Sequence, residues 1–147
     1  MQGRSKRILL IEDDADDVFL IRHACERAGL IGEISSAENG LAAITLFEDF
    51  AAQAATDKAP EFIFLDLNMP VMSGLDFLRW LRSAAQWRTL PVIVLTTSED
   101  PRDVSAAYEL GANAYLVKPN SATDFANMFK AVNAFWFSFN RPPQLAS

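Results

Sequence analysis

Several reactive side chains follow directly after short apolar segments of the sequence: Glu12, Asp13, Asp66, Thr96 and Lys118. Carboxylates that converge at a partly buried site repel one another, and a hard divalent cation such as Mg²⁺ resolves this repulsion. A carboxylate whose charge is offset in this way can attack phosphorus and form an acyl phosphate. If these residues meet in space, the chemistry that they predict is therefore phosphoryl transfer.

Asp66 is the predicted nucleophile. The four residues before it, 62–65, are apolar without alternation, which is typical of a central parallel strand covered on both faces. Pro70 cannot donate to a strand ladder, so the strand must end near Asp66. Mg²⁺ takes about six oxygen ligands and keeps several waters. The predicted ligands are Asp13, Asp66, Glu12 through a coordinated water, and the backbone carbonyl of Asn68.

Lys118 and Thr96 are predicted to bind the phosphoryl oxygens. In phosphoryl transfer a protein mainly positions groups and neutralises the charge that spreads over these oxygens. Each residue also has an ordinary interpretation, with Lys118 as a surface charge and Thr96 as a hydroxyl at a strand end. Four reactive strand-end positions in one chain favour the functional interpretation over these separate ones.

Five short apolar segments alternate with five segments of helical periodicity, which predicts an α/β fold with a parallel sheet. Right-handed crossovers then place helices on both faces, giving three layers. The expected strands are residues 7–11, 33–37, 62–65, 91–95 and 114–117. The expected helices begin near Asp14, Asn39, Ser73, Pro101 and Ser121, the first with Asp14, Asp16 and Asp17 in its first turn. Since the carboxyl ends of parallel strands share one edge, all the reactive side chains should lie there.

Composition argues against a nucleic-acid-binding, membrane-spanning or secreted protein. The formal net charge of −6 argues against nucleic-acid binding, and no apolar run approaches the roughly 20 residues that cross a membrane. No secretory signal is present, and the single cysteine, Cys25, suits a reducing cytoplasm. We expect one cytoplasmic domain over residues 1–138 and a tail over residues 139–147, with no separate output domain.

The C-terminal segment carries an apolar stripe at spacings of three and four residues. A helix over residues 121–139 would be roughly 28 Å long, whereas a short strand offers only roughly 17–20 Å to cover. We therefore expect the last turns to overhang the core and to form a homodimer contact through Phe135, Trp136, Phe137 and Phe139. The alternative is that the helix bends and buries these rings on its own domain.

The chain resembles a bacterial two-component response-regulator receiver domain. The matching segments are residues 8–13, 65–70, 73–75, 95–97 and 115–119. The resemblance implies a flavodoxin-like (βα)5 fold with strand order 2-1-3-4-5, Mg²⁺ as cofactor and a sensor histidine kinase as phosphoryl donor. It also implies these roles: phosphoacceptor Asp66, Mg²⁺ ligands Glu12 and Asp13, phosphoryl contact Lys118, and switch pair Thr96 and Tyr115.

The connection between Ala51 and Pro60 and the ending Phe135-Trp136-Phe137 resemble those of the single-domain regulators that partner phytochrome-type sensor histidine kinases. That likeness implies a bacteriophytochrome as a possible partner and a dimer made by C-terminal arms.

Three other functions fit parts of the pattern. A phosphohydrolase of the haloacid dehalogenase type would carry a second Asp two residues after the nucleophile, where this chain has Asn68. A flavin-binding protein would need a Ser/Thr/Gly-rich phosphate loop after the first strand, where Glu12 and Asp13 would repel phosphate. A degenerate receiver that only binds and dimerises would have no need of Thr96 and Lys118. We expect no enzyme activity beyond the chain's own phosphorylation and dephosphorylation.

Overall fold

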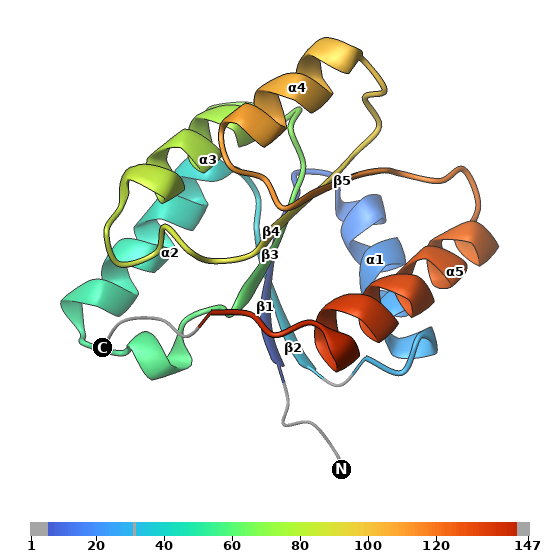
Figure 1. Cartoon of the computed structure of the whole chain (residues 1–147), viewed down its shortest axis with the longest axis horizontal. Coiled ribbons are helices and arrows are strands. Elements are labelled where there is room, and N and C mark those ends of the chain that lie inside the picture. The colour runs from blue at the N-terminus through green and yellow to red at the C-terminus, as the bar shows by residue number, and fades with distance from the viewer. Residues whose placement is uncertain (1–5, 31, 144–147) are drawn as a thin grey trace.

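A parallel sheet of five strands lies between two layers of helices in the computed structural model, which describes residues 6–30 and 32–143 (Figure 1). The strand order is β2-β1-β3-β4-β5, so the predicted flavodoxin-like fold is confirmed. The strands are β1 (Lys6–Ile11), β2 (Gly32–Ala37), β3 (Phe62–Leu65), β4 (Val92–Thr96) and β5 (Ala114–Val117). The helices are α1 (Ala15–Arg27), α2 (Gly40–Ala52), η1 (Thr56–Lys58), α3 (Gly74–Ser83), α4 (Pro101–Glu109), α5 (Ala122–Val132) and η2 (Asn133–Phe139).

Side-chain caps fix where the helices begin. The side chains of Asn39, Ser73 and Ser121 accept hydrogen bonds from the backbone N–H three residues later, as predicted. Asp14 differs from its predicted place, because it is the N-cap of α1 and not part of its first turn. Its Oδ1 accepts from the N–H groups of Asp16 and Asp17 at 2.8 and 3.2 Å. The first turn of α1 therefore presents Asp16 and Asp17 beside the end of β1.

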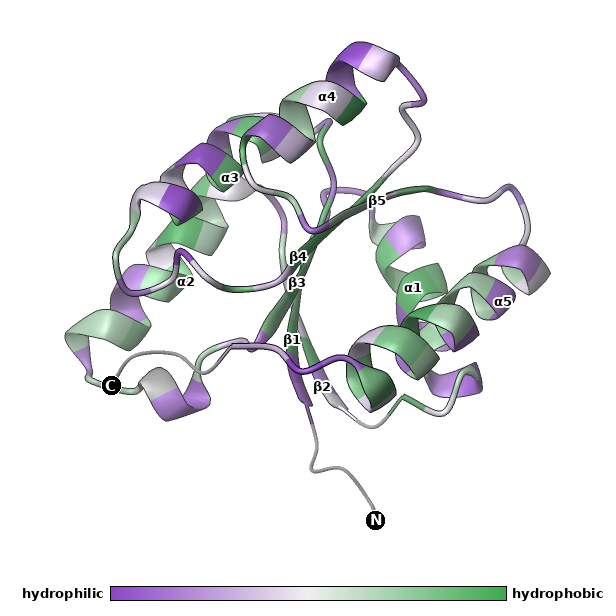
Figure 2. Cartoon of the chain, viewed as in Figure 1, coloured by the Kyte–Doolittle hydropathy of each residue, from purple (hydrophilic) through white to green (hydrophobic). Residues whose placement is uncertain are grey.

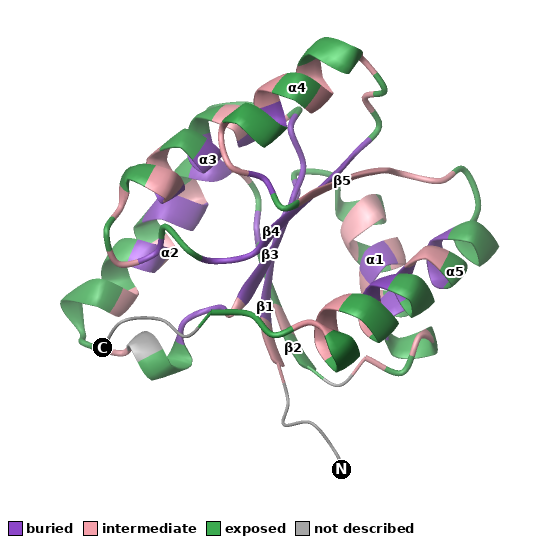
Figure 3. Ribbon diagram, in the orientation of Figure 1, coloured by how far each residue is buried: buried purple, intermediate pink, exposed green. Residues whose placement is uncertain are grey.

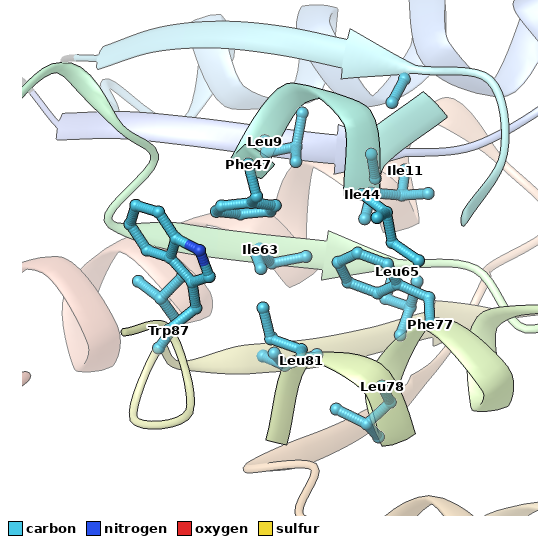
Figure 4. Packing of buried hydrophobic residues seen from close by; sticks show 14 of the residues in the cluster. Leu9, Ile11, Ile44, Phe47, Ile63, Leu65, Phe77, Leu78, Leu81 and Trp87 are labelled. Carbon is cyan, nitrogen blue, oxygen red and sulfur yellow. The ribbon is translucent and has the colours of Figure 1, made fainter. Parts of the chain in front are cut away.

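Two hydrophobic cores lie on the two faces of the sheet. Alternate residues of the central strands point to opposite faces, so each strand supplies both cores. Leu9 and Ile63 pack with Phe47 of α2 and Phe77 of α3 on one face (Figure 4). The other face packs against α1 and α5. Figure 2 shows the central strands as hydrophobic and Figure 3 shows them as buried, which explains why their sequences do not alternate.

The strand register determines which side chains meet at the carboxyl edge of the sheet. Ile11 pairs with Leu65, so the next residues along each strand are Glu12 and Asp66. On the other side, Thr96 pairs with Val117, and the N–H of Lys118 donates to the carbonyl of Thr96 at 2.8 Å. The predicted reactive residues are thus brought together at one edge.

The C-terminal segment is not the continuous α-helix that was expected. The α-helix ends at Val132, and η2 continues it as a wider π-helix in which the N–H of Asn140 donates to the carbonyl of Phe135 at 2.7 Å. A π-turn shifts the register of the side chains that follow it. Trp136 and Phe137 consequently turn inward and contact Phe62, with ring centroids 5.6 and 4.8 Å apart.

The prediction that four aromatic rings overhang the core is therefore wrong for Trp136 and Phe137. Phe135 and Phe139 remain 54% and 78% exposed. After η2 the described chain runs, in the view of Figure 1, leftward from α5 past the lower end of the sheet. No helix within the described residues is long and apolar enough to span a membrane.

Candidate functional site

Three carboxylates form one cluster at the carboxyl edge of the sheet. One oxygen from each of Glu12, Asp13 and Asp66 lies within 4.8 Å of the others. Glu12 and Asp66 are only 3% and 6% exposed, whereas Asp13 faces solvent. Three oxygen donors at this spacing, one of them open to water, have the chemistry of a site for a hard divalent cation.

Lys118 reaches into this cluster from the end of β5. Its Nζ donates to Glu12 Oε2 at 2.5 Å and to Asp17 Oδ2 at 2.7 Å, and it lies 3.7 Å from Asp66 Oδ2. The Lys118 side chain is 5% exposed. A nearly buried ammonium group that is held by carboxylates can neutralise negative charge on Asp66 or on an anion that arrives beside it.

Burial and ion pairing shift the pKa values of this pair. Burial raises the pKa of Glu12 to about 7, although the bond from Lys118 acts in the opposite direction. Burial alone would lower the pKa of Lys118, but its hydrogen bonds to Asp17 and Glu12 outweigh burial and raise it. Lys118 is therefore a permanent cation, while Glu12 changes protonation near neutral pH.

The hydroxyl of Thr96 is buried without a partner. Thr96 is fully buried, and its Oγ1 is the single buried side-chain nitrogen or oxygen atom within residues 6–30 and 32–143 that makes no hydrogen bond. An unsatisfied buried hydroxyl is unfavourable by about 1–3 kcal/mol. A hydroxyl at the end of β4, on the edge that holds Asp66, is available to an incoming oxygen acceptor.

Tyr115 lies on β5, one strand beyond Thr96. Its ring is partly buried against the core that contains α2 and α3, and its hydroxyl donates to the carbonyl of Ser98 at 3.0 Å. Burial raises the pKa of this hydroxyl. Ser98 in turn donates to Asp103 of α4 at 2.6 Å, so Tyr115 is linked through the β4–α4 loop to α4.

The loop after Asp66 packs closely against its own strand. The N–H of Asn68 approaches Asp66 Oδ1 at 3.4 Å, and the N–H of Gly74 donates to the carbonyl of Leu67 at 3.0 Å. A Cβ atom at position 74 would collide with the backbone carbonyl of Asp66. The turn that presents Asp66 therefore requires glycine at position 74.

Asp17 is the residue that sequence reasoning placed correctly but did not assign to the site. A negative charge in the first turn of a helix is favoured by the helix dipole, which explains the place of Asp17 on α1. It does not explain the contact of Asp17 with Lys118. The available signal was its place in the first turn of the helix that directly follows Glu12 and Asp13. The long reach of Lys118 cannot be derived from that place.

The model of the response regulator receiver domain family matches residues 8–130 of the chain. This chain belongs to that family. Receiver domains are signalling proteins of two-component systems, and their general mechanism is phosphorylation of an aspartate with Mg²⁺ by a histidine kinase.

Known receivers cover nearly all of this chain. It is 33% identical to the probable methanogenesis regulatory protein FilR2 of Methanothrix harundinacea, over 92% of this chain and 86% of FilR2. It is also 33% identical to the response regulator Rcp1 of Synechocystis sp., over 89% of this chain and 88% of Rcp1.

Solved structures of receivers agree with this fold. The Mn²⁺-bound form of Rcp1 superposes with a TM-score of 0.80 at 32% identity, covering 95% of this chain and 99% of that one. The phosphorylated cyanobacterial phytochrome response regulator RcpA superposes with a TM-score of 0.85 at 28% identity, covering 96% and 100%. The chain thus has phytochrome response regulators among its relatives.

Proposed function

We propose that this receiver accepts one phosphoryl group on Asp66 from a phosphohistidine of a sensor histidine kinase and then changes its contacts with other proteins. One observation carries the proposal: the nearly buried Asp66 carboxylate lies in one cluster with Glu12 and Asp13, 3.7 Å from the Lys118 ammonium. The proposed chemistry is confined to the phosphorylation and dephosphorylation of the chain's own Asp66.

In the proposed step an oxygen of Asp66 attacks phosphorus, and the bond from phosphorus to the imidazole nitrogen breaks. The electron pair of that bond leaves with the nitrogen, and Asp66 becomes an acyl phosphate. Lys118 donates to one phosphoryl oxygen, and the Thr96 hydroxyl donates to another.

Mg²⁺ is the proposed cofactor, and the donor set fits it. The proposed ligands are Asp13, Asp66, the backbone carbonyl of Asn68, and Glu12 through a water. When bound, the cation supplies positive charge that offsets the carboxylates and the phosphoryl oxygens. The oxygen atoms within 4.8 Å of one another support this assignment.

The proposed switch is the pair Thr96 and Tyr115. A hydroxyl without a partner gains one when a phosphoryl oxygen arrives, so phosphorylation favours the conformation in which Thr96 has moved toward Asp66. The space that Thr96 leaves is then open to the Tyr115 ring. Because Tyr115 bonds the carbonyl of Ser98, such a movement would alter the loop before α4.

Labelling with radioactive acetyl phosphate tests the proposed function. With Mg²⁺ the chain is expected to gain one phosphate that is stable in acid and labile in base, and none when EDTA removes the cation. Sustained release of inorganic phosphate from p-nitrophenyl phosphate would instead indicate a phosphohydrolase. The absence of label from both acetyl phosphate and phosphorylated kinases would indicate a receiver that only binds. Transfer from a panel of kinases, including bacteriophytochromes, identifies the donor.

Mg²⁺ binding is expected to strengthen as pH rises from about 6 to about 8, because the cation must displace the proton of Glu12. The pKa of Glu12, which burial raises to about 7, places the change in that interval. The measurement is the Mg²⁺-induced rise in melting temperature at three pH values, with Glu12→Gln as the control whose response stays flat. Equal Mg²⁺ affinity at both ends of the interval would contradict this ligand role.

The same group makes the cation-free protein sensitive to pH. The folded state holds the Glu12 proton more tightly than the unfolded state, in which the pKa of this carboxyl group is near 4.5. The stability that the protonated form contributes is complete below that value and is lost as pH rises through about 7.

We further propose that the receiver forms a homodimer through η2 and the tail. Phe135 and Phe139 support this proposal, because they are large apolar side chains that stay 54% and 78% exposed on one short helix. The domain over residues 1–138 and the arm over residues 139–147 are proposed to be distinct in role. A cytoplasmic location is proposed, which suits the free thiol of Cys25.

Phe139→Asp is expected to convert the proposed dimer to a monomer and to leave the domain folded, because the Phe139 side chain is 78% exposed and makes little contact with its own core. Light scattering gives the mass, and Phe19→Asp is the control because Phe19 is also exposed, at 68%, but belongs to α1 and not to η2 or the tail. The control should remain dimeric. Trp136 is unsuitable for this test since its ring packs on Phe62. A wild-type protein that stays monomeric at high concentration, with and without phosphate, would exclude the dimer.

A further inference from the structure

Lys118 has two strong anchors, and one of them lies outside the carboxylate cluster. Its shortest contacts are with Glu12 and with Asp17, whose Oδ2 is 2.7 Å from Nζ. Asp17 belongs to the first turn of α1 and is not one of the three carboxylates that could share a cation. Its side chain is 25% exposed, so it closes over the ammonium group from the solvent side.

The ammonium group of Lys118 has one N–H donor more than its two short contacts use. An ammonium group has three N–H donors. Glu12 and Asp17 accept two of them, which leaves the third for the side of Asp66, whose Oδ2 is 3.7 Å away. That distance is too long for a hydrogen bond, so the third donor remains available to an oxygen that arrives on Asp66.

Without Asp17 the lysine would have a single short anchor. The Lys118 side chain is a flexible four-carbon stem, and holding it in one geometry requires more than one strong contact. Glu12 supplies only one short contact to Nζ, through Oε2, and it also belongs to the carboxylate cluster. Asp17 is the second anchor, and Lys118 is its ion-pair partner among the residues that the structure describes.

We propose that Asp17 is a positioning residue that holds the Lys118 ammonium so that one of its donors is directed at the phosphoryl group on Asp66. This inference rests on the proposed function, to which it adds a role for Asp17. A positioned donor acts mainly on the rate of the chemical step, since the group that it stabilises appears during the transfer.

The matched pair for testing this is Asp17→Asn and Asp16→Asn. Both variants remove one negative charge from the same turn of α1, but Asp16 is exposed and makes no ion pair within the described residues. The probe is phosphorylation by acetyl phosphate with Mg²⁺ over a range of donor concentrations, which separates the limiting rate from the half-saturating concentration.

Asp17→Asn is expected to lower the limiting rate about three- to tenfold, while the half-saturating concentration changes less than about twofold. Asp16→Asn should leave both values within about twofold of the wild type. Asp17→Glu should recover at least about half of the rate, because a carboxylate at the partly exposed position can still reach Nζ. The proposal is overturned if Asp17→Asn matches the wild type, or if the two asparagine variants change alike.

A second readout does not depend on phosphorylation. The side-chain ammonium protons of Lys118, followed by heteronuclear NMR without a phosphodonor, should exchange slowly with water in the wild type and in Asp16→Asn. They should exchange faster in Asp17→Asn. Equal exchange in all three proteins would overturn the anchoring. A wild type that takes no label from acetyl phosphate would defeat the proposed function instead, while the exchange measurement would still decide the role of Asp17.

Discussion

Replacing Asp66 by asparagine is expected to abolish covalent phosphorylation of the chain and to leave its fold intact. The amide of asparagine is not a nucleophile toward phosphorus, so labelling by acetyl phosphate should fall at least about a hundredfold. Asparagine has nearly the same shape, and its oxygen can still face the N–H of Asn68. Removing one of three converging charges should also leave the unfolding midpoint without Mg²⁺ unchanged or higher.

Asp13→Asn is the companion to this variant because it removes a proposed cation ligand and keeps the nucleophile. Label should accumulate slowly in Asp13→Asn, and its yield should respond to a higher Mg²⁺ concentration. Both variants are expected to be folded, and far-UV circular dichroism is the measurement that checks this. Stoichiometric, base-labile label on Asp66→Asn would show that another residue is the acceptor.

Gly74→Ala is expected to give the largest loss of stability of any glycine-to-alanine change among the described glycines, because its added Cβ makes the closest approach to neighbouring atoms. The new Cβ would meet the backbone carbonyl of Asp66 and the Cα of Leu67, and backbone atoms cannot turn aside as a flexible side chain can. We expect the free energy of unfolding to fall by about 3 kcal/mol, at the upper end of overpacking effects. The forced movement of Asp66 should also slow its phosphorylation.

Gly29→Ala separates this collision from ordinary backbone strain. Gly29 has φ +77°, but nothing lies within 4 Å of the position that its Cβ would occupy. Its replacement should lower the free energy of unfolding by only about 1–2 kcal/mol, the effect of a left-handed conformation alone, without changing the rate of phosphorylation. Urea unfolding curves compare the two variants. Similar losses for both would mean that the loop after β3 relaxes around the new methyl group.

The sequence sufficed for the sheet because its signals are local and strong. The apolar segment 62–65, the acid after it and the proline at position 70 together place a buried strand and its end. Once the strands are parallel, their carboxyl ends share an edge, so the gathering of Asp66 with Glu12 follows from topology alone. The caps Asn39, Ser73 and Ser121 were predictable for the same reason, because each capping bond spans three residues.

The features that escaped prediction depend on contacts between distant segments. Lys118 reaches Asp17 across the edge of the sheet, and no periodicity in either segment encodes that meeting. The unpaired hydroxyl of Thr96 is a property of its surroundings and not of its type. The inward turn of Trp136 was predicted only as the alternative to an exposed arm, because it depends on one π-helical segment and on Phe62, more than seventy positions earlier in the chain.

In the π-helical segment η2, the direction in which each aromatic ring points depends on how many residues separate that ring from the end of α5. Each residue of an α-helix turns the next side chain by about 100°. Deleting one residue early in η2 would let a regular α-helix continue from α5, and every aromatic side chain beyond the deletion would rotate by roughly that angle. Trp136 and Phe137, which now contact Phe62, would then leave their present positions against its ring. The length of this segment, and not only its composition, therefore sets how much aromatic surface the end of the described chain exposes to solvent.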